Sequence, residues 1–254
     1  MNPVYAGVTG AFVSSFVLLR WDVRIQGHQY LPREGPAVLA TNHVSYLDFV
    51  FAGYGARQRG RQVRFVAKRE VFDHRLTGPL MRGMGHIPVD RGADTSKVFD
   101  QVSGALSGGE VVGMFPEGTI STSFVPLAGR PGAARMAVEN EVPLIPGVVW
   151  GSQRIFTKGR KATAARGTAV TVAFGPPIAH APSDDPYEVH ARLMVAIGDL
   201  VDAAQRTYPQ RPADAADAWW LPAHLGGSAP TPEQAAVTAQ AEADERRRRG
   251  SSAG

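Results

Sequence analysis

The chain of 254 residues contains no cysteine, which excludes disulfides, thiolate catalysis and zinc–thiolate sites. It also lacks a G-x-S-x-G nucleophile motif and a G-x-x-x-x-G-K-[ST] loop, which argues against serine hydrolases and P-loop nucleotidases. Six of the seven histidines show no metal-ligand spacing. We therefore expect neither a cofactor nor an obligate metal.

The composition is that of an ordinary globular protein, with 44% hydrophobic and 20% charged residues. Its length suits one α/β domain with appendages. The net charge of +4 fits anionic lipid head groups, phosphorylated substrates or nucleic acid as partners.

Short apolar runs alternate with stretches of helical pattern between residues 22 and 180. The runs are β-branched or continuously apolar, as is typical of strands buried on both faces. The pattern predicts an α/β fold with a mixed, largely parallel central sheet flanked by helices. The expected strands are 37–42, 63–68, 86–90, 111–116, 143–150 and 169–174, and the expected helices are 46–57, 71–82, 96–107, 131–140 and 186–206.

Residues 3–19 carry no charge and are followed by Arg20 and Trp21. Seventeen residues lie at the short limit of what can span a bilayer, and glycine and hydroxyl side chains dilute the run. An interfacial anchor suits this pattern best, with a buried core helix and a true membrane span as alternatives. We expect a membrane-associated segment over 1–20.

We expect the globular domain over 21–208 and an irregular segment with a basic, mobile tail over 209–254. A helix is predicted over 232–246. The terminal arginine run lacks the interleaved aromatics of a nucleic-acid site, so we expect no nucleic-acid partner. Contact with anionic lipid and a plain solubilising role both remain open for it.

His43 follows the predicted strand 37–42, and Asp48 lies five residues later. The two cannot face each other on one regular helix, but they can meet if His43 lies in the turn and Asp48 begins the next helix. Ser45 and Asp48 have capping-box spacing, which predicts Ser45 as the N-cap. A neutral imidazole oriented by a carboxylate can act as a general base on a hydroxyl group. Asp48 as a simple helix cap is the alternative.

A second motif, FPEGTIS over 115–121, leaves a predicted strand through a tight turn. Pro116 and Gly118 suit that turn, which would present Glu117 and Thr119 beside backbone amides. Such a turn can bind a polar, hydroxyl-bearing acceptor. An ordinary structural turn is the alternative.

Together these motifs resemble the glycerolipid acyltransferase family, the 1-acylglycerol-3-phosphate O-acyltransferases (PlsC-like). NHVSYLD is similar to the family's N-H-x-x-x-x-D signature and FPEGTIS to its F-P-E-G-T-R-S block. Three further segments resemble family blocks and occur in the family's order: FVAKRE at 65–70, GHIPVDRG at 85–92 and VPLIPGVV at 142–149.

The resemblance implies that His43 is the catalytic base and that Asp48 orients it. It also implies that Glu117 and Gly118 hold the acceptor, and that Lys68 and Arg91 are candidate ligands of its phosphate. A solvated surface charge is the alternative for both cations.

One position departs from the family pattern, because Ile120 replaces the third block's arginine. Either other cations take over the phosphate, or the acceptor is not a simple lysophosphatidic acid. Arg130, at the start of a predicted helix, is a third candidate cation, since helix N-termini favour anions.

The resemblance implies transfer of a fatty acyl group from acyl-CoA or acyl carrier protein to the sn-2 hydroxyl of 1-acylglycerol-3-phosphate, which forms phosphatidic acid for phospholipid biosynthesis. Another lysolipid or glycolipid acceptor is the alternative, and a catalytically silent membrane-binding protein is a third. We expect a peripheral or monotopic protein of the cell membrane, with the catalytic domain on its cytoplasmic side.

Overall fold

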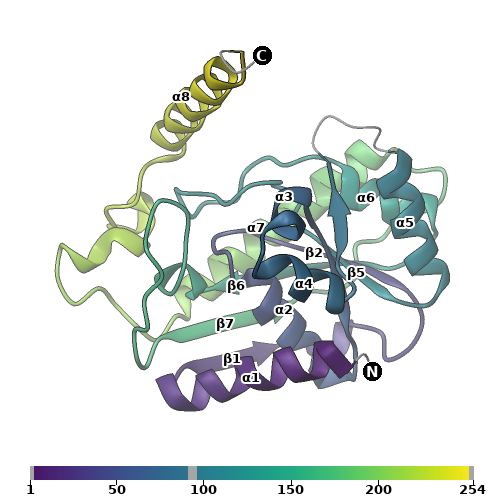
Figure 1. Ribbon diagram of the computed structural model, residues 1–254, viewed down its shortest axis with the longest axis horizontal. Helices are drawn as coiled ribbons and strands as arrows, with labels where there is room; N and C mark the ends of the chain where they lie inside the picture. Colours follow the sequence, from purple (N-terminus) through teal and green to yellow (C-terminus); the bar gives the residue numbers. More distant parts are fainter. Residues whose placement is uncertain (1–2, 91–95, 252–254) are drawn as a thin grey trace.

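A computed structural model describes residues 3–90 and 96–251, which form a seven-stranded sheet with helices on both faces (Figure 1). The strand order is β1-β7-β6-β2-β5-β3-β4, and neighbouring strands are parallel except for β6 and β7. This confirms the mixed, largely parallel sheet. The strands are β1 (Asp22–Gln26), β2 (Ala37–Thr41), β3 (Val63–Lys68), β4 (Ile87–Val89), β5 (Val111–Met114), β6 (Leu144–Trp150) and β7 (Ala169–Phe174).

The longer helices agree with the sequence pattern, and 96–107 and 186–206 are helical over the residues expected. The start of the latter is fixed by Asp185, whose side chain accepts a hydrogen bond from the backbone N–H of Tyr187, and by proline at the first helical position. The helices are α1 (Pro3–Leu19), α2 (Asp48–Ala56), α3 (Arg69–Asp73), α4 (Thr77–Gly83), α5 (Ser96–Ser107), α6 (Gly132–Glu139), α7 (Pro186–Arg206) and α8 (Pro232–Ser251).

The sheet separates two hydrophobic cores. Every residue of β2 is buried, and alternate side chains point to opposite faces. Val38 and Ala40 join the core beneath α5, α6 and α7, whereas Leu39 joins the core beneath α1 and α2. This two-sided burial explains the continuous apolar run and places the end of β2 at the centre of the molecule.

Two predictions about the elements were incomplete. Strand β1 was not predicted, because its sequence DVRIQ alternates exposed and half-buried residues and contains charges. The predicted helix over 71–82 is divided at His74, whose backbone is extended. The His74 ring accepts hydrogen bonds from the backbone amides of Leu76 and Thr77, a local arrangement that competes with helix continuation.

Helix α1 lies against the domain instead of standing apart from it (Figure 1). Phe16 stacks on Phe51 of α2 with ring centroids 5.6 Å apart, and Tyr5 is also buried. The opposite face exposes Val17 and Leu18 and carries no charge. No helix within residues 3–90 and 96–251 has the length and apolar character needed to cross a membrane. The anchoring role stays a prediction.

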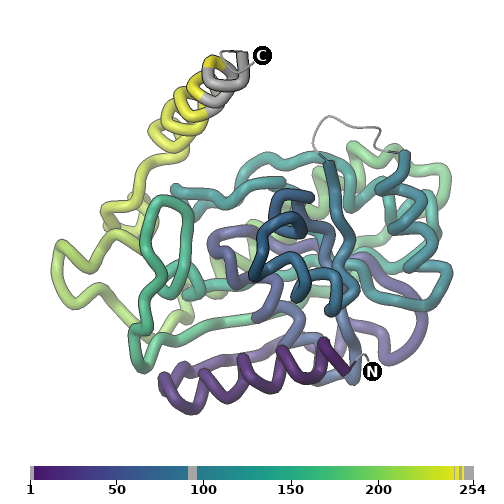
Figure 2. The backbone as a smooth tube through the Cα atoms, in the orientation of Figure 1, coloured from purple at the N-terminus to yellow at the C-terminus, as the bar shows by residue number. Residues whose placement is uncertain are grey.

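The segment between α7 and α8 contains two short 3-10 turns, and part of it is buried. Trp220 is buried in the core beneath α7. Helix α8 then extends beyond the sheet, as Figure 2 shows at the C-terminal end, and its Glu242 pairs with Lys158 at 2.7 Å. It continues to Ser251, through the arginine run expected in the mobile tail. The mobility of that tail stays a prediction.

Candidate active site

Four segments meet at one edge of the sheet, the edge formed by the carboxyl ends of the parallel strands. His43 follows β2, Glu117 follows β5, Ser152 follows β6, and Lys68 ends β3. This edge is where open α/β sheets generally place their functional groups. The parallel register places β2 beside residues of β5 that lie 74 positions later and beside residues of β6 that lie 106 positions later.

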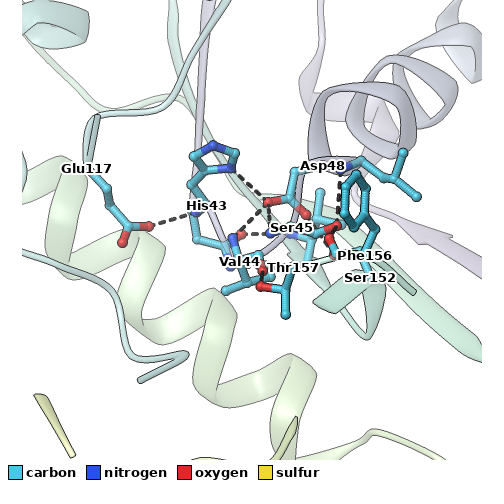
Figure 3. Close-up of polar contacts among 11 residues, drawn as sticks. His43, Val44, Ser45, Asp48, Glu117, Ser152, Phe156 and Thr157 are labelled. Carbon is cyan, nitrogen blue, oxygen red and sulfur yellow. Dashed lines mark hydrogen bonds and ion pairs between the residues drawn. The ribbon is translucent and has the colours of Figure 1, made fainter. Parts of the chain in front are cut away.

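His43 and Asp48 meet as the sequence predicted (Figure 3). The Nδ1 atom of His43 lies 3.0 Å from Oδ2 of Asp48. Side chains five positions apart can meet here because His43 lies in the loop before α2 and Asp48 is the first residue of that helix. The imidazole remains 18% exposed, whereas the Asp48 side chain is fully buried.

Asp48 also organises the loop that carries His43. Its Oδ2 accepts hydrogen bonds from the backbone N–H groups of Val44 and Ser45, each at 2.7 Å. The expected capping box forms only in part, because the Ser45 hydroxyl accepts from the amide of Leu47 and the N-cap residue is Leu47. Capping of the loop and orientation of His43 therefore coexist in one carboxylate.

This geometry determines which nitrogen of His43 can do chemistry. A carboxylate only accepts hydrogen bonds, so Nδ1 of His43 carries the proton directed at Asp48. The other nitrogen, Nε2, is then the basic atom of the neutral ring. A base oriented in this way can take the proton from an attacking hydroxyl group.

Glu117 binds the backbone that supports His43. Its Oε1 accepts a hydrogen bond from the N–H of His43 at 2.7 Å, and its Oε2 accepts one from the N–H of Leu127 at 2.9 Å. Burial and, to a smaller extent, the nearby charge of Asp48 raise the pKa of Glu117 to about 8, against the opposing effect of the two amide donors. Both carboxyl oxygens thus face the protein's own backbone.

The rest of the 115–121 segment encloses His43. The ring of Phe115 stacks on the imidazole with centroids 4.0 Å apart and planes 16° apart. The backbone N–H of Ser121 donates to the carbonyl of His43 at 2.8 Å. Gly118 has φ of +65°, as the predicted tight turn requires. The first and third sequence blocks therefore form one structural unit.

The predicted substrate ligands lie in different surroundings. Gly118 is exposed and Thr119 is half-buried, so both can face a substrate. Lys68 is half-buried at the end of β3, and Arg130 is exposed, with its N–H bonded to the carbonyl of Pro116. Arg91 lies outside the described residues. Their roles as ligands stay predictions.

Ile120, the position that departs from the family pattern, is 6% exposed. Its side chain therefore packs inward and offers no group to a substrate. Among the residues that the structure describes, no group of three or more acidic or histidine side chains is placed to hold a metal ion.

Sequence reasoning missed several residues that support the site. Asn42 exchanges two hydrogen bonds with the backbone of Val149 in β6, and its position next to His43 in the N-H-x-x-x-x-D signature was an available signal. The segment after β6 also braces the loop. The Thr157 hydroxyl donates to the carbonyl of Val44, and the Ser152 hydroxyl donates to Asp48. No local motif marks these two.

The raised pKa of Glu117 predicts a pH-dependent contribution to stability. The folded state binds this proton more tightly than the unfolded state, so the contribution is complete at low pH and is lost as pH rises between about 4.5 and 8. Urea unfolding of the wild type and of Glu117→Gln, measured across this range, should show the wild-type advantage shrinking by at least about 1 kcal/mol. A constant difference would mean that the pKa is ordinary.

Comparison with known proteins connects this site to a family. A protein-family profile described as Acyltransferase matches residues 22–150. A 1-acyl-sn-glycerol-3-phosphate acyltransferase of Bacillus subtilis is 30% identical over 145 residues, covering 56% of this chain and 71% of that protein. A bovine 1-acyl-sn-glycerol-3-phosphate acyltransferase alpha is 33% identical over 148 residues, covering 54% of this chain and 50% of that protein.

The match spans 39% of a chloroplastic relative from Arabidopsis thaliana, so the chain covers less than half of that protein. Among solved structures, the 1-acyl-sn-glycerophosphate acyltransferase PlsC of Thermotoga maritima has a TM-score of 0.64 at 20% identity, with 81% of each chain covered, which shows that the fold is shared. The family match includes the β2–α2 loop with His43 and Asp48 and the segment with Glu117, and the chain belongs to the acyltransferase family.

Proposed function

We propose that this acyltransferase moves a fatty acyl group from an acyl thioester, either acyl-CoA or acyl carrier protein, to the sn-2 hydroxyl of 1-acylglycerol-3-phosphate. The product is phosphatidic acid. The observation that carries the proposal is the His43–Asp48 pair at 3.0 Å, at the edge of the sheet where three further segments converge. The names of the relatives support the choice of acceptor.

In this mechanism Nε2 of His43 takes the proton as the acceptor oxygen attacks the thioester carbonyl. Asp48 stabilises the imidazolium through the Nδ1 hydrogen bond. Collapse of the tetrahedral intermediate breaks the carbon–sulfur bond, and the departing thiolate receives the proton from His43. An ester and a free thiol result, and no enzyme nucleophile is required.

One observation favours a second candidate acceptor. Ile120 is buried and apolar where the resembled family has an arginine, so this segment brings no cation to a phosphate. Lys68 or Arg130 supplies that charge if the acceptor is lysophosphatidic acid. Another lysolipid or a glycolipid acceptor makes smaller demands on a phosphate site. The assembled pair and family membership favour catalysis over silent membrane binding.

The acceptor lies in a membrane, and the outer face of α1 supports docking there. Val17 and Leu18 are 79% and 70% exposed, and no charge interrupts α1. Arg20 and Trp21 follow at its end, a composition suited to the head-group boundary. We place the protein on the cytoplasmic face of the cell membrane as part of this proposal.

Replacing His43 by alanine should lower acyl transfer by about 10²–10⁴-fold, because the general base is lost. The measurement is release of free thiol from an acyl thioester in the presence of lysophosphatidic acid. His224→Ala, at an exposed histidine in the 3-10 turn Ala223–Leu225, is the matched control and should keep wild-type activity. Full activity in His43→Ala would remove the proposed base.

A panel of lysolipid acceptors with one labelled acyl thioester tests the substrate. We expect the highest kcat/KM with lysophosphatidic acid, because cations beside the site favour a phosphomonoester. Assays with His43→Ala supply the enzyme-independent background. If lysophosphatidic acid is the poorest acceptor in the panel, the proposed substrate is wrong and the second candidate takes its place.

Placing charge on the outer face of α1 should weaken membrane association. The double variant Val17→Glu, Leu18→Glu alters two exposed positions, so the fold should persist. Sedimentation with vesicles containing anionic lipid should recover a smaller bound fraction than for the wild type. Val195→Glu, at a 66% exposed apolar position on α7, is the control. Equal binding by all three proteins contradicts docking through α1.

A further inference from the structure

The second carboxylate oxygen of Asp48 has a donor from a distant part of the chain. The hydroxyl of Ser152 donates to Oδ1 of Asp48 at 2.6 Å, and both residues are fully buried (Figure 3). Ser152 follows β6 in a short 3-10 turn, 104 positions from Asp48. It also lies just beyond residues 22–150, the range that the family profile matches.

We infer that Ser152 is a positioning residue for the acyl transfer reaction, which acts on His43 through Asp48. The inference rests on the proposed roles of that pair. Oδ2 of Asp48 receives all three donors from the catalytic loop, namely the ring of His43 and the amides of Val44 and Ser45. The Ser152 hydroxyl bonds the opposite oxygen and thereby fixes the rotation of the carboxylate about its terminal torsion.

That torsion needs fixing because rotation about the last bond of an aspartate side chain is intrinsically broad. A rotated carboxylate would move Oδ2 away from Nδ1 of His43 and turn the imidazole away from the acceptor. Small displacements of this kind can cost about 10²-fold in rate. A buried oxygen without a donor is also unfavourable, so the carboxylate would seek another orientation.

The segment around Ser152 is anchored on two sides. Toward the catalytic loop, the Ser45 hydroxyl donates to the carbonyl of Phe156 at 2.6 Å. Away from it, the side-chain amide of Gln153 donates to the carbonyl of Trp220, and the guanidinium of Arg154 lies 4.4 Å from the centre of the Trp220 ring. The C-terminal segment thus braces the turn that presents Ser152.

This arrangement gives the residues after Tyr208 a part in the site without contact with substrate. Trp220 is 1% exposed and packs against Tyr208, with ring centroids 5.6 Å apart. Trp220, in the core beneath α7, contacts Arg154, which lies in the same short turn as Ser152. Ser152 in turn contacts Asp48.

The test is steady-state kinetics of Ser152→Ala with a saturating acyl thioester. We expect kcat to fall roughly 10- to 100-fold while KM for the acceptor stays within about twofold, because substrate contacts are unchanged. Thr168→Val is the matched control. It also removes a buried hydroxyl, which among the described residues donates to the local carbonyl of Ala165, and it should keep the wild-type kcat.

A spectroscopic measurement separates positioning from general destabilisation. In the wild type the His43 Nδ1 proton, bonded to a buried carboxylate, should give a downfield proton resonance. The signal should shift or broaden in Ser152→Ala and remain in Thr168→Val. Should Ser152→Ala fail to fold, Ser152→Thr and Ser152→Val take its place, since threonine and valine have similar volumes and only threonine carries a hydroxyl. The threonine variant should be at least tenfold faster.

An unchanged kcat and an unchanged Nδ1 signal in Ser152→Ala would overturn the inference, as would equal rates for the threonine and valine variants. His43→Ala, assayed in parallel, distinguishes the two proposals. If His43→Ala is active, the proposed base is wrong. If it is inactive while Ser152→Ala keeps full activity, only the role of Ser152 is wrong.

Discussion

The site depends on one buried carboxylate. Asp48 is fully enclosed, and removing such a group from water is costly unless hydrogen-bond donors replace the water. Four donors do so: three from the loop after β2 and one from the turn after β6. The fourth donor reaches Asp48 only when β2 and β6 lie side by side. Complete hydrogen bonding of Asp48 therefore depends on formation of the sheet.

A second buried carboxyl group lies on the other side of His43. Glu117 accepts from the backbone of His43, so the loop is held between two acidic side chains. Burial, with a smaller effect of the Asp48 charge, raises the pKa of Glu117 to about 8, so that near pH 7 the protonated form lies near Asp48 with less repulsion. The two carboxyl groups thus have different partners. Asp48 binds the ring of His43 and the loop amides, whereas Glu117 binds the backbone N–H groups of His43 and Leu127.

The sequence predicted those parts of the structure that depend on residues close together in the chain. Continuous apolar runs marked the buried strands, and the spacing of His43 and Asp48 indicated a loop followed by a helix. Strand β1 was not predicted because it is the outermost strand of the sheet and alternates polar with apolar residues. Ser152 was not predicted for a different reason. Its contact with Asp48 spans 104 positions, and no local sequence pattern indicates which strand end will face which loop.

The 115–121 segment shows how the structure changes the meaning of a motif. Its resemblance implies contact with the acceptor, yet Phe115, Glu117 and Ser121 are directed at His43. Ile120 packs inward as well, which leaves Gly118 and Thr119 as the outward-facing positions. Neither carries charge. The segment therefore positions His43, and under the proposed function a phosphate would be bound by cations on other elements, such as Lys68 at the end of β3.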